Sequence, residues 1–194
     1  MSQVWLTSDL HLGHPLVSQL RGHPSVAAHD ASVLAELRAH VRPEDTFWIL
    51  GDVALGDRHA GLSSLWSVPC TSRHLVSGNH DYCHPAGHRR SHEHSRDYTA
   101  VFDSVNMAGV LRGNGLKFHL SHFPYAGEGD RDMPDRHVQW RLRDCGADLI
   151  HGHTHDTVKA RRSPKGSRMI NVCWEAWGRP VTLDEVCDLV LKLP

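Results

Sequence analysis

The chain has 194 residues, of which 40% are hydrophobic and 22% charged, and its formal net charge is −1. This length predicts one domain, residues 1–194, with a substantial buried core. A net charge this close to zero excludes an overall field that attracts nucleic acid or anionic membranes. We therefore expect no membrane partner and no strong general affinity for nucleic acid.

The five cysteines are odd in number and form no C-x-x-C pair. This pattern favours reduced thiols over a disulfide framework or a zinc ribbon. The first residues, MSQVWLTSDLHLGH, lack a basic region and reach Asp9 before any long apolar stretch, so they do not resemble a signal peptide. No run approaches the length of a transmembrane helix. We expect a cytoplasmic protein.

The first half of the chain alternates predicted strands with a helix. A run rich in branched and aromatic residues predicts a strand at 4–9. Apolar residues at helical intervals then predict a helix within 24–41. Further strands are expected at 46–52 and 74–81. The segment 82–98 is polar and rich in histidine and arginine, and we interpret it as an insertion in the scaffold.

The second half continues the alternation. Strands are expected at 116–122, 148–155 and 167–174, with a further candidate at 105–111. The stretch 137–146 predicts a second helix, closed by its final glycine.

A terminal helix follows Pro180. Thr182 stands at its N-cap and Glu185 three residues later, the spacing of a capping box. Strands that alternate with helices predict a mixed α/β fold.

Five predicted strands end at side chains that can bind metals. These side chains are Asp9, His11, Asp52, Asn79, His122, His153 and His155. Open α/β sheets place their ligand sites beyond the carboxyl ends of strands, so the five loops could converge on one cavity. Carboxylate, imidazole and amide ligands without thiolate suit Mn, Fe or Zn. Seven candidates are too many for one tetrahedral ion. Two ions that share a bridging carboxylate would use them all, an arrangement suited to in-line displacement at phosphorus.

The same residues form ordered motifs. The motifs Asp9-x-His11, Gly51-Asp52, Gly78-Asn79-His80-Asp81, His122 and Gly152-His153-x-His155 resemble the five motifs of the calcineurin-like metallophosphoesterase superfamily. The small size is typical of its bacterial and phage members. The resemblance covers about residues 4 to 175 and implies a four-layer α/β/β/α sandwich. Two central mixed sheets would carry a dinuclear metal site at their strand ends.

The resemblance also implies a role for each site residue. The first ion would be bound by Asp9, His11, Asp52 and His155, and the second by Asp52, Asn79, His122 and His153. His80 would act as the catalytic residue that contacts the phosphate and stabilises or protonates the leaving oxygen. His14, Asn79 and His80 are candidates for substrate binding, although His14 could equally be a residue of a helix N-terminus. The cofactors would be two divalent ions, Mn²⁺ first, with Fe, Zn, Ni or Co as alternatives.

The implied activity is hydrolysis of phosphodiesters by hydroxide that the ions generate from bound water. Monoesters remain an alternative, and nucleotides such as 2′,3′-cyclic nucleotides are the leading substrate class. Protein phosphatases of the superfamily carry G-D-x-x-D-R-G, whereas this chain reads GDVALGDR, which counts against a phosphoprotein substrate. The alternative from another class is a scaffold for protein contacts, as in a retromer subunit. The complete ligand set favours catalysis, and the oligomeric state stays open, with a dimer as one option.

Other residues have more than one interpretation. Asp81 is expected to support the turn around the ligands. The histidines at 84, 88, 92 and 94 could form a third metal site, a flap over the substrate or a solvated insertion. Tyr125, Trp174 and Trp177 could stack on a base, but core packing is their commoner role.

Overall fold

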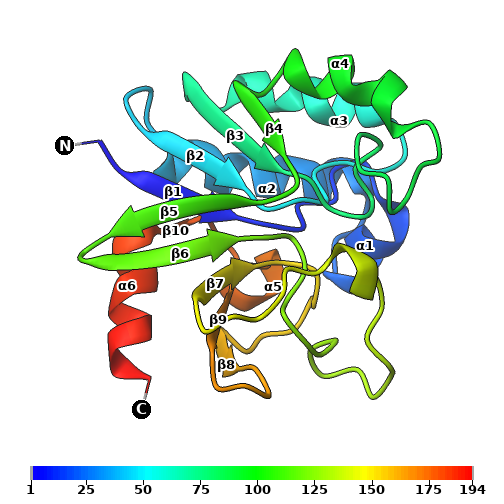
Figure 1. Cartoon of the computed structure of the whole chain (residues 1–194). Helices are drawn as coiled ribbons and strands as arrows, with labels where there is room; N and C mark the ends of the chain where they lie inside the picture. The colour runs from blue at the N-terminus through cyan, green and yellow to red at the C-terminus, as the bar shows by residue number, and fades with distance from the viewer. Residues whose placement is uncertain (1, 194) are drawn as a thin grey trace.

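Two five-stranded mixed sheets lie face to face in the computed structural model, which describes residues 2–193 (Figure 1). The first sheet has the order β10-β1-β2-β3-β4, and only β10 runs antiparallel to its neighbour. Its strands are β1 (Val4–Thr7), β2 (Thr46–Ile49), β3 (Ser72–Val76), β4 (Ser104–Asn106) and β10 (Val181–Thr182).

The second sheet has the order β5-β6-β7-β9-β8, with β6, β7 and β9 parallel and the two edge strands antiparallel. Its strands are β5 (Gly109–Gly113), β6 (Leu116–Leu120), β7 (Asp148–His151), β8 (Ala160–Arg162) and β9 (Arg168–Asn171). The predicted mixed α/β fold with two central mixed sheets is confirmed.

Six α-helices and three 3₁₀ turns accompany the sheets in the described part of the chain. The helices are α1 (Pro15–Leu20), α2 (Val26–His40), α3 (Arg58–Ser64), α4 (Ser95–Thr99), α5 (Trp174–Trp177) and α6 (Leu183–Lys192). The 3₁₀ turns are η1 (Leu65–Ser67), η2 (Ser91–His94) and η3 (Val138–Trp140). No helix within residues 2–193 is long and apolar enough to cross a membrane.

The apolar core lies in two main layers. Leu6, Phe118 and Ile150 meet between the sheets, and Val186 of α6 closes this layer at one end. The outer face of the first sheet is covered by α2, α3 and α4. There Phe47, Ile49 and Leu75 of the strands pack with Val33 and Leu37 of α2, so the predicted helix is confirmed. Thr182 and Glu185 form the predicted capping box of α6.

The prediction of a helix over 137–146 is wrong. Only η3 forms there, and the chain leaves the helical region at Arg141, whose ψ is 140°. Arg141 instead bonds to carbonyl groups of Arg136 and Gly127, and Asp144 accepts from Ser163 and Ser167. These tertiary bonds override a weak local helical pattern.

Two further expectations change in detail. The candidate strand at 105–111 is divided between β4 and β5, and β8 and β10 were not expected. The segment 82–98 is partly structured, since it contains η2 and the start of α4. Within it, His84 is buried and packs edge-on against Phe123 and Trp140. This part of the chain is therefore packed onto the scaffold and only partly solvated.

Gly51 allows the loops after β2 and β3 to approach each other. Its φ is +90°, and a Cβ atom there would lie 2.6 Å from the backbone nitrogen of Gly78 and closer still to Nδ1 of His122. Gly146 has the same φ of +90°, but a Cβ atom there would meet nothing within 4 Å. A substitution at Gly146 therefore introduces backbone strain alone, whereas the same substitution at Gly51 introduces both strain and crowding.

We expect Gly146→Ala to lower the free energy of unfolding by about 1–3 kcal/mol, the usual penalty for an alanine whose backbone is in the left-handed region. Gly51→Ala should lose a further ~1–3 kcal/mol because of overpacking against His122 and Gly78. Urea unfolding of both variants measures the difference. Equal losses would show that crowding at Gly51 has no energetic consequence.

Candidate metal centre

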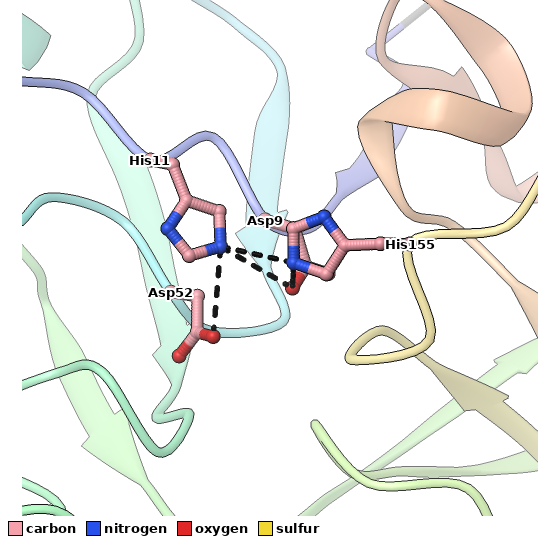
Figure 2. Close-up of side chains that lie close together, drawn as sticks. All are labelled: Asp9, His11, Asp52 and His155. Carbon is pink, nitrogen blue, oxygen red and sulfur yellow. Dashed lines mark hydrogen bonds and ion pairs between the residues drawn. The ribbon is translucent and has the colours of Figure 1, made fainter. Parts of the chain in front are cut away.

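Four side chains from three strand-end loops converge on one point (Figure 2). Asp9 and His11 follow β1, Asp52 follows β2 and His155 follows β7. Each offers one ligand atom, and these atoms all lie within 4.8 Å of one another. Nε2 of His11 lies 3.1 Å from Nε2 of His155, 3.8 Å from Asp9 Oδ1 and 3.7 Å from Asp52 Oδ2. This is the group expected for the first ion.

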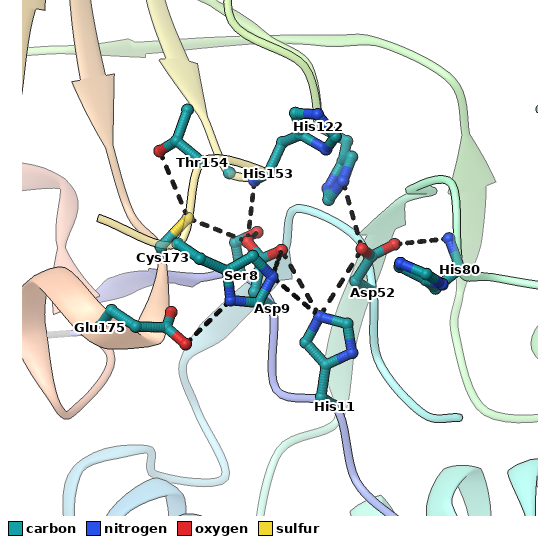
Figure 3. Close-up of polar contacts among 12 residues, drawn as sticks. Ser8, Asp9, His11, Asp52, His80, His122, His153, Thr154, Cys173 and Glu175 are labelled. Atoms are coloured by element: carbon teal, nitrogen blue, oxygen red, sulfur yellow. Dashed lines mark hydrogen bonds and ion pairs between the residues drawn. The ribbon is translucent and has the colours of Figure 1, made fainter. Parts of the chain in front are cut away.

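A second group adjoins the first through Asp52 (Figure 3). Nε2 of His122 lies 3.4 Å from Asp52 Oδ2 and 3.2 Å from Asn79 Oδ1. The ring of His153 is 5.2 Å from that of His122, centroid to centroid. Asp52 thus stands between the two groups, at the position that a bridging carboxylate would occupy. All seven residues predicted as ligands are brought to one edge of the sandwich.

The chemistry of these residues fits divalent cations. Oδ1 of Asp9 is buried and accepts no hydrogen bond, although Nε2 of His155 lies 3.2 Å away. Burial and the charge of Asp9 raise the pKa of Asp52 well above its usual value. Two neighbouring buried carboxylates repel each other, and a cation between them removes that repulsion. Oxygen and imidazole donors without thiolate suit Mn, Fe or Zn.

Backbone strain is concentrated at the same residues. Five of the seven predicted ligands have φ in the left-handed region, namely Asp9 (58°), His11 (51°), Asp52 (54°), His153 (73°) and His155 (51°). Such conformations cost about 1–3 kcal/mol each and persist only where the surroundings enforce them. Here Asp9 N donates to Gly51 O and His11 N to Asp52 O, both at 3.0 Å, so the loops after β1 and β2 hold each other in place.

Asp81 supports the turns beneath the site, as its position in the sequence suggests. Its carboxylate accepts from the backbone N–H groups of Asp52, Val53 and Gly78 at 2.8–3.0 Å. Burial and the charge of Asp52 raise the pKa of Asp81 to about 7. The residue therefore fixes the direction in which Asp52 faces the site.

Glu175, which was not predicted from the sequence, lies behind His155. Oε1 of Glu175 is 2.9 Å from Nδ1 of His155, and Arg21 donates to the same oxygen at 2.7 Å. Burial alone would lower the pKa of His155, but Asp9 and Glu175 raise it to about 10. With Nδ1 held by Glu175, Nε2 is the nitrogen that faces the other ligands. No local spacing distinguishes Glu175, because its partner is distant in sequence.

Asp9 has hydrogen-bond donors that were not predicted either. Ser8 Oγ and Cys173 Sγ donate to its Oδ2, as does the backbone N–H of His153 at 3.0 Å (Figure 3). Burial raises the pKa of the Cys173 thiol well above its usual value, so this sulfur acts as a donor and not as a thiolate ligand.

His80 and His14 lie at the rim beside His11. The rings of His80 and His14 are 5.4 and 5.5 Å from that of His11. His80 is partly exposed, and its backbone N–H donates to Oδ1 of Asp52 at 2.8 Å. Partial burial and His122 lower the pKa of His80 to about 4. His14 is the N-cap of α1, where its Nδ1 accepts from Val17 N, so the structure gives it the helix role at the border of the site.

The remaining candidates lie elsewhere or pack in the core. The histidines at 84, 88, 92 and 94 belong to no group of potential metal ligands within the described residues. Tyr125 and Trp174 are buried, and Trp177 donates from Nε1 to Asn171 O at 2.8 Å. These aromatic side chains stabilise the fold around the site.

Comparison with known proteins matches residues 3–174 to the calcineurin-like phosphoesterase superfamily domain. The Gene 66 protein of Mycobacterium phage L5 is 41% identical over 98% of this chain and 95% of its own length. The Gene 66 protein of Mycobacterium phage D29 is 40% identical, with 98% and 96% covered. A solved structure of AQ665 from Aquifex aeolicus, a protein of unknown function, has a TM-score of 0.70. It is 24% identical and covers 97% of this chain and 100% of its own.

The position of Asp52 leads to a prediction about metal content. Because the carboxylate of Asp52 faces both ligand groups, we expect Asp52→Asn to lower the affinity for each of the two ions at least about tenfold. Elemental analysis after dialysis should give less than one Mn²⁺ per chain, against two for the parent. Asp97→Asn, which removes a carboxylate paired with Arg58 outside the site, should retain both ions. Two ions retained by Asp52→Asn would show that Asp52 does not bridge.

Proposed function

Because this chain belongs to the calcineurin-like phosphoesterase superfamily, we propose that it is a dinuclear-metal-dependent hydrolase of phosphodiesters. The observation that carries the proposal is the position of Asp52, whose Oδ2 lies 3.7 Å from Nε2 of His11 and 3.4 Å from Nε2 of His122. One carboxylate between two sets of ligands supports two adjacent ions, which is the arrangement that in-line phosphoryl displacement uses.

The residues of the chain have distinct tasks in this reaction. Asp9, His11 and His155 would hold the first ion, Asn79, His122 and His153 the second, and Asp52 both. When bound, the ions supply Lewis acidity, which activates water and neutralises charge on the phosphoryl oxygens. The proposed ion is Mn²⁺, and Fe, Zn, Ni or Co would fit the same donors.

His80 would act as a hydrogen-bond donor to the substrate. Its lowered pKa keeps the imidazole neutral near pH 7, so it offers one N–H and no spare proton. A neutral donor at the rim stabilises charge that develops on the leaving oxygen. This favours the electrostatic role of His80 over proton donation. The ring of His14 lies 5.5 Å from that of His11, centroid to centroid, and would border the leaving oxygen as well.

The surroundings of the site favour a small substrate. A groove of about 240 Å³ lies beside His155 and is lined by Arg131, Asp130 and Thr157 among others. This volume is slightly below the range of about 300–1,000 Å³ for small-molecule sites, so the groove suits a small ligand. We propose nucleotide-type phosphodiesters, including 2′,3′-cyclic nucleotides, with monoesters as weaker substrates. The five cysteines are unpaired, which supports a reducing, cytoplasmic setting.

The first test is hydrolysis of bis(p-nitrophenyl) phosphate by protein stripped with EDTA. We expect no turnover without metal, recovery with added Mn²⁺, and a preference for the diester over p-nitrophenyl phosphate. Failure with Mn²⁺, Fe²⁺, Zn²⁺, Ni²⁺ and Co²⁺ would contradict the proposal and favour a scaffold role for the fold.

A second test concerns His80. We expect His80→Ala to lower kcat by about 10²–10³-fold while both ions stay bound, since the ring acts on the substrate and not on the metals. The control is His92→Ala, which removes an exposed histidine of η2 and should leave kcat unchanged. Near-parental kcat in His80→Ala would remove this residue from the mechanism.

A further inference from the structure

Glu128 is a buried carboxylate in the irregular chain between β6 and β7. Its side chain is fully shielded from solvent. Oε2 of Glu128 lies 3.2 Å from Nε2 of His153, on the side of the ring that would face away from the second ion if Nδ1 were its ligand. Nothing in the sequence around Glu128 resembles a motif, so only the folded chain reveals its position beside His153.

Arginines surround this carboxylate. Arg136 donates from its backbone nitrogen to Oε1 and from Nε to Oε2, both at 2.9 Å. Nη2 of Arg141 donates to Oε1, and Nη2 of Arg131 lies 3.7 Å from Oε2. These guanidinium groups compensate for the desolvation of the carboxylate. Glu128 is therefore held in one place, and the segment 127–141 is folded around it.

The same segment also holds the backbone of His153. Arg131 donates from Nη2 to the carbonyl oxygens of His153 and Thr154, at 3.1 and 3.2 Å. His153 has a φ of +73°, a conformation that needs support from outside. The ring of His153 is thus fixed by Glu128 and its backbone by Arg131.

Backbone strain independently links the segment to the site. Of the seven non-glycine residues with left-handed φ between residues 2 and 193, five are predicted ligands and Asn114 lies in the turn between β5 and β6. The seventh is His137, at +54°. It follows Arg136, whose backbone N–H is bound by Glu128, and its ring lies 5.6 Å from that of His153. Glu128 therefore stabilises a strained turn that packs on the second ligand group.

We propose that Glu128 is a positioning residue for the second metal ion and that it couples the segment 127–141 to the binding of that ion. It accepts a hydrogen bond from Nε2 of His153 and so leaves Nδ1 for the metal. Glu175 performs the converse task at the first ion, where it holds Nδ1 of His155 and leaves Nε2. The inference rests on the two-ion centre of the proposed function.

The coupling has a specific consequence. His155 is supported by Glu175 of α5, whereas His153 is supported by a segment that is irregular apart from η3. Loss of the Glu128 carboxylate would release both the ring of His153 and the segment around it. The affinity for the second ion should therefore fall, while the affinity for the first ion should stay unchanged.

The experiment is a Mn²⁺ titration of metal-free protein by calorimetry, followed by electron paramagnetic resonance of the loaded protein. For Glu128→Gln we expect one of the two binding events to lose about 10–100-fold in affinity, with the other within twofold of the parent. The spectrum should change from an exchange-coupled pair to a single Mn²⁺. Glu128→Ala should show a larger loss, because it also removes the hydrogen-bond acceptor.

Glu185→Gln is the matched control. Glu185 also pairs with an arginine, Arg179, and with Thr182, but it lies in the capping box of α6. This variant should lower thermal stability and leave both binding events unchanged. Circular dichroism and melting curves of all variants identify any that fail to fold. If Glu128→Ala fails, Glu128→Gln, which keeps the shape of the side chain, decides the matter.

Three results would overturn the inference. They are parental affinity for both ions in Glu128→Gln, equal weakening of both ions, and a single bound ion in the parent. Because none of these measurements involves a substrate, they separate this inference from the proposed function. A parent that binds two ions but hydrolyses no phosphoester would refute the function and leave the role of Glu128 intact.

Discussion

The mutual repulsion of Asp9 and Asp52 is the constraint on which the rest of the site depends. Both carboxylates are buried at the ends of neighbouring parallel strands, where burial and the charge of Asp9 raise the pKa of Asp52 well above its usual value. In addition to this repulsion, both residues have a backbone φ in the left-handed region. Such a combination is stable only if many other contacts enforce it, and it leaves a cluster of carboxylate and imidazole groups that could hold a metal ion.

Those contacts are distributed unequally around the site. Asp81 orients Asp52, because its carboxylate accepts hydrogen bonds from three backbone N–H groups, including that of Asp52. His155 is backed by Glu175 and Arg21, which belong to or adjoin short helices. His153 depends on Glu128 and its arginines in a mostly irregular segment. The two ligand groups have similar chemistry, but the second is supported by the part of the chain with the least regular structure.

The residues at the strand ends could be predicted from the sequence, because short apolar runs that stop at Asp9, Asp52 or His122 carry a local signal. The supporting residues could not. Glu175 lies 20 residues from His155, and Glu128 lies 25 residues from His153, so only the folded chain brings each pair together. The prediction of a helix over 137–146 failed for the same reason. Arg141 there bonds to Glu128, and this tertiary contact outweighs a short helical pattern.

The orientation of the two histidines follows from this arrangement. His153 and His155 are separated by one residue, yet Glu128 holds Nε2 of the first and Glu175 holds Nδ1 of the second. Each carboxylate holds one ring nitrogen, so in the proposed centre His153 would offer Nδ1 and His155 would offer Nε2 to the ions. A Gly-His-x-His motif alone contains no information about this choice. The direction in which each imidazole faces is decided by acidic residues far away in the sequence, and a change in either one alters the site without changing a ligand.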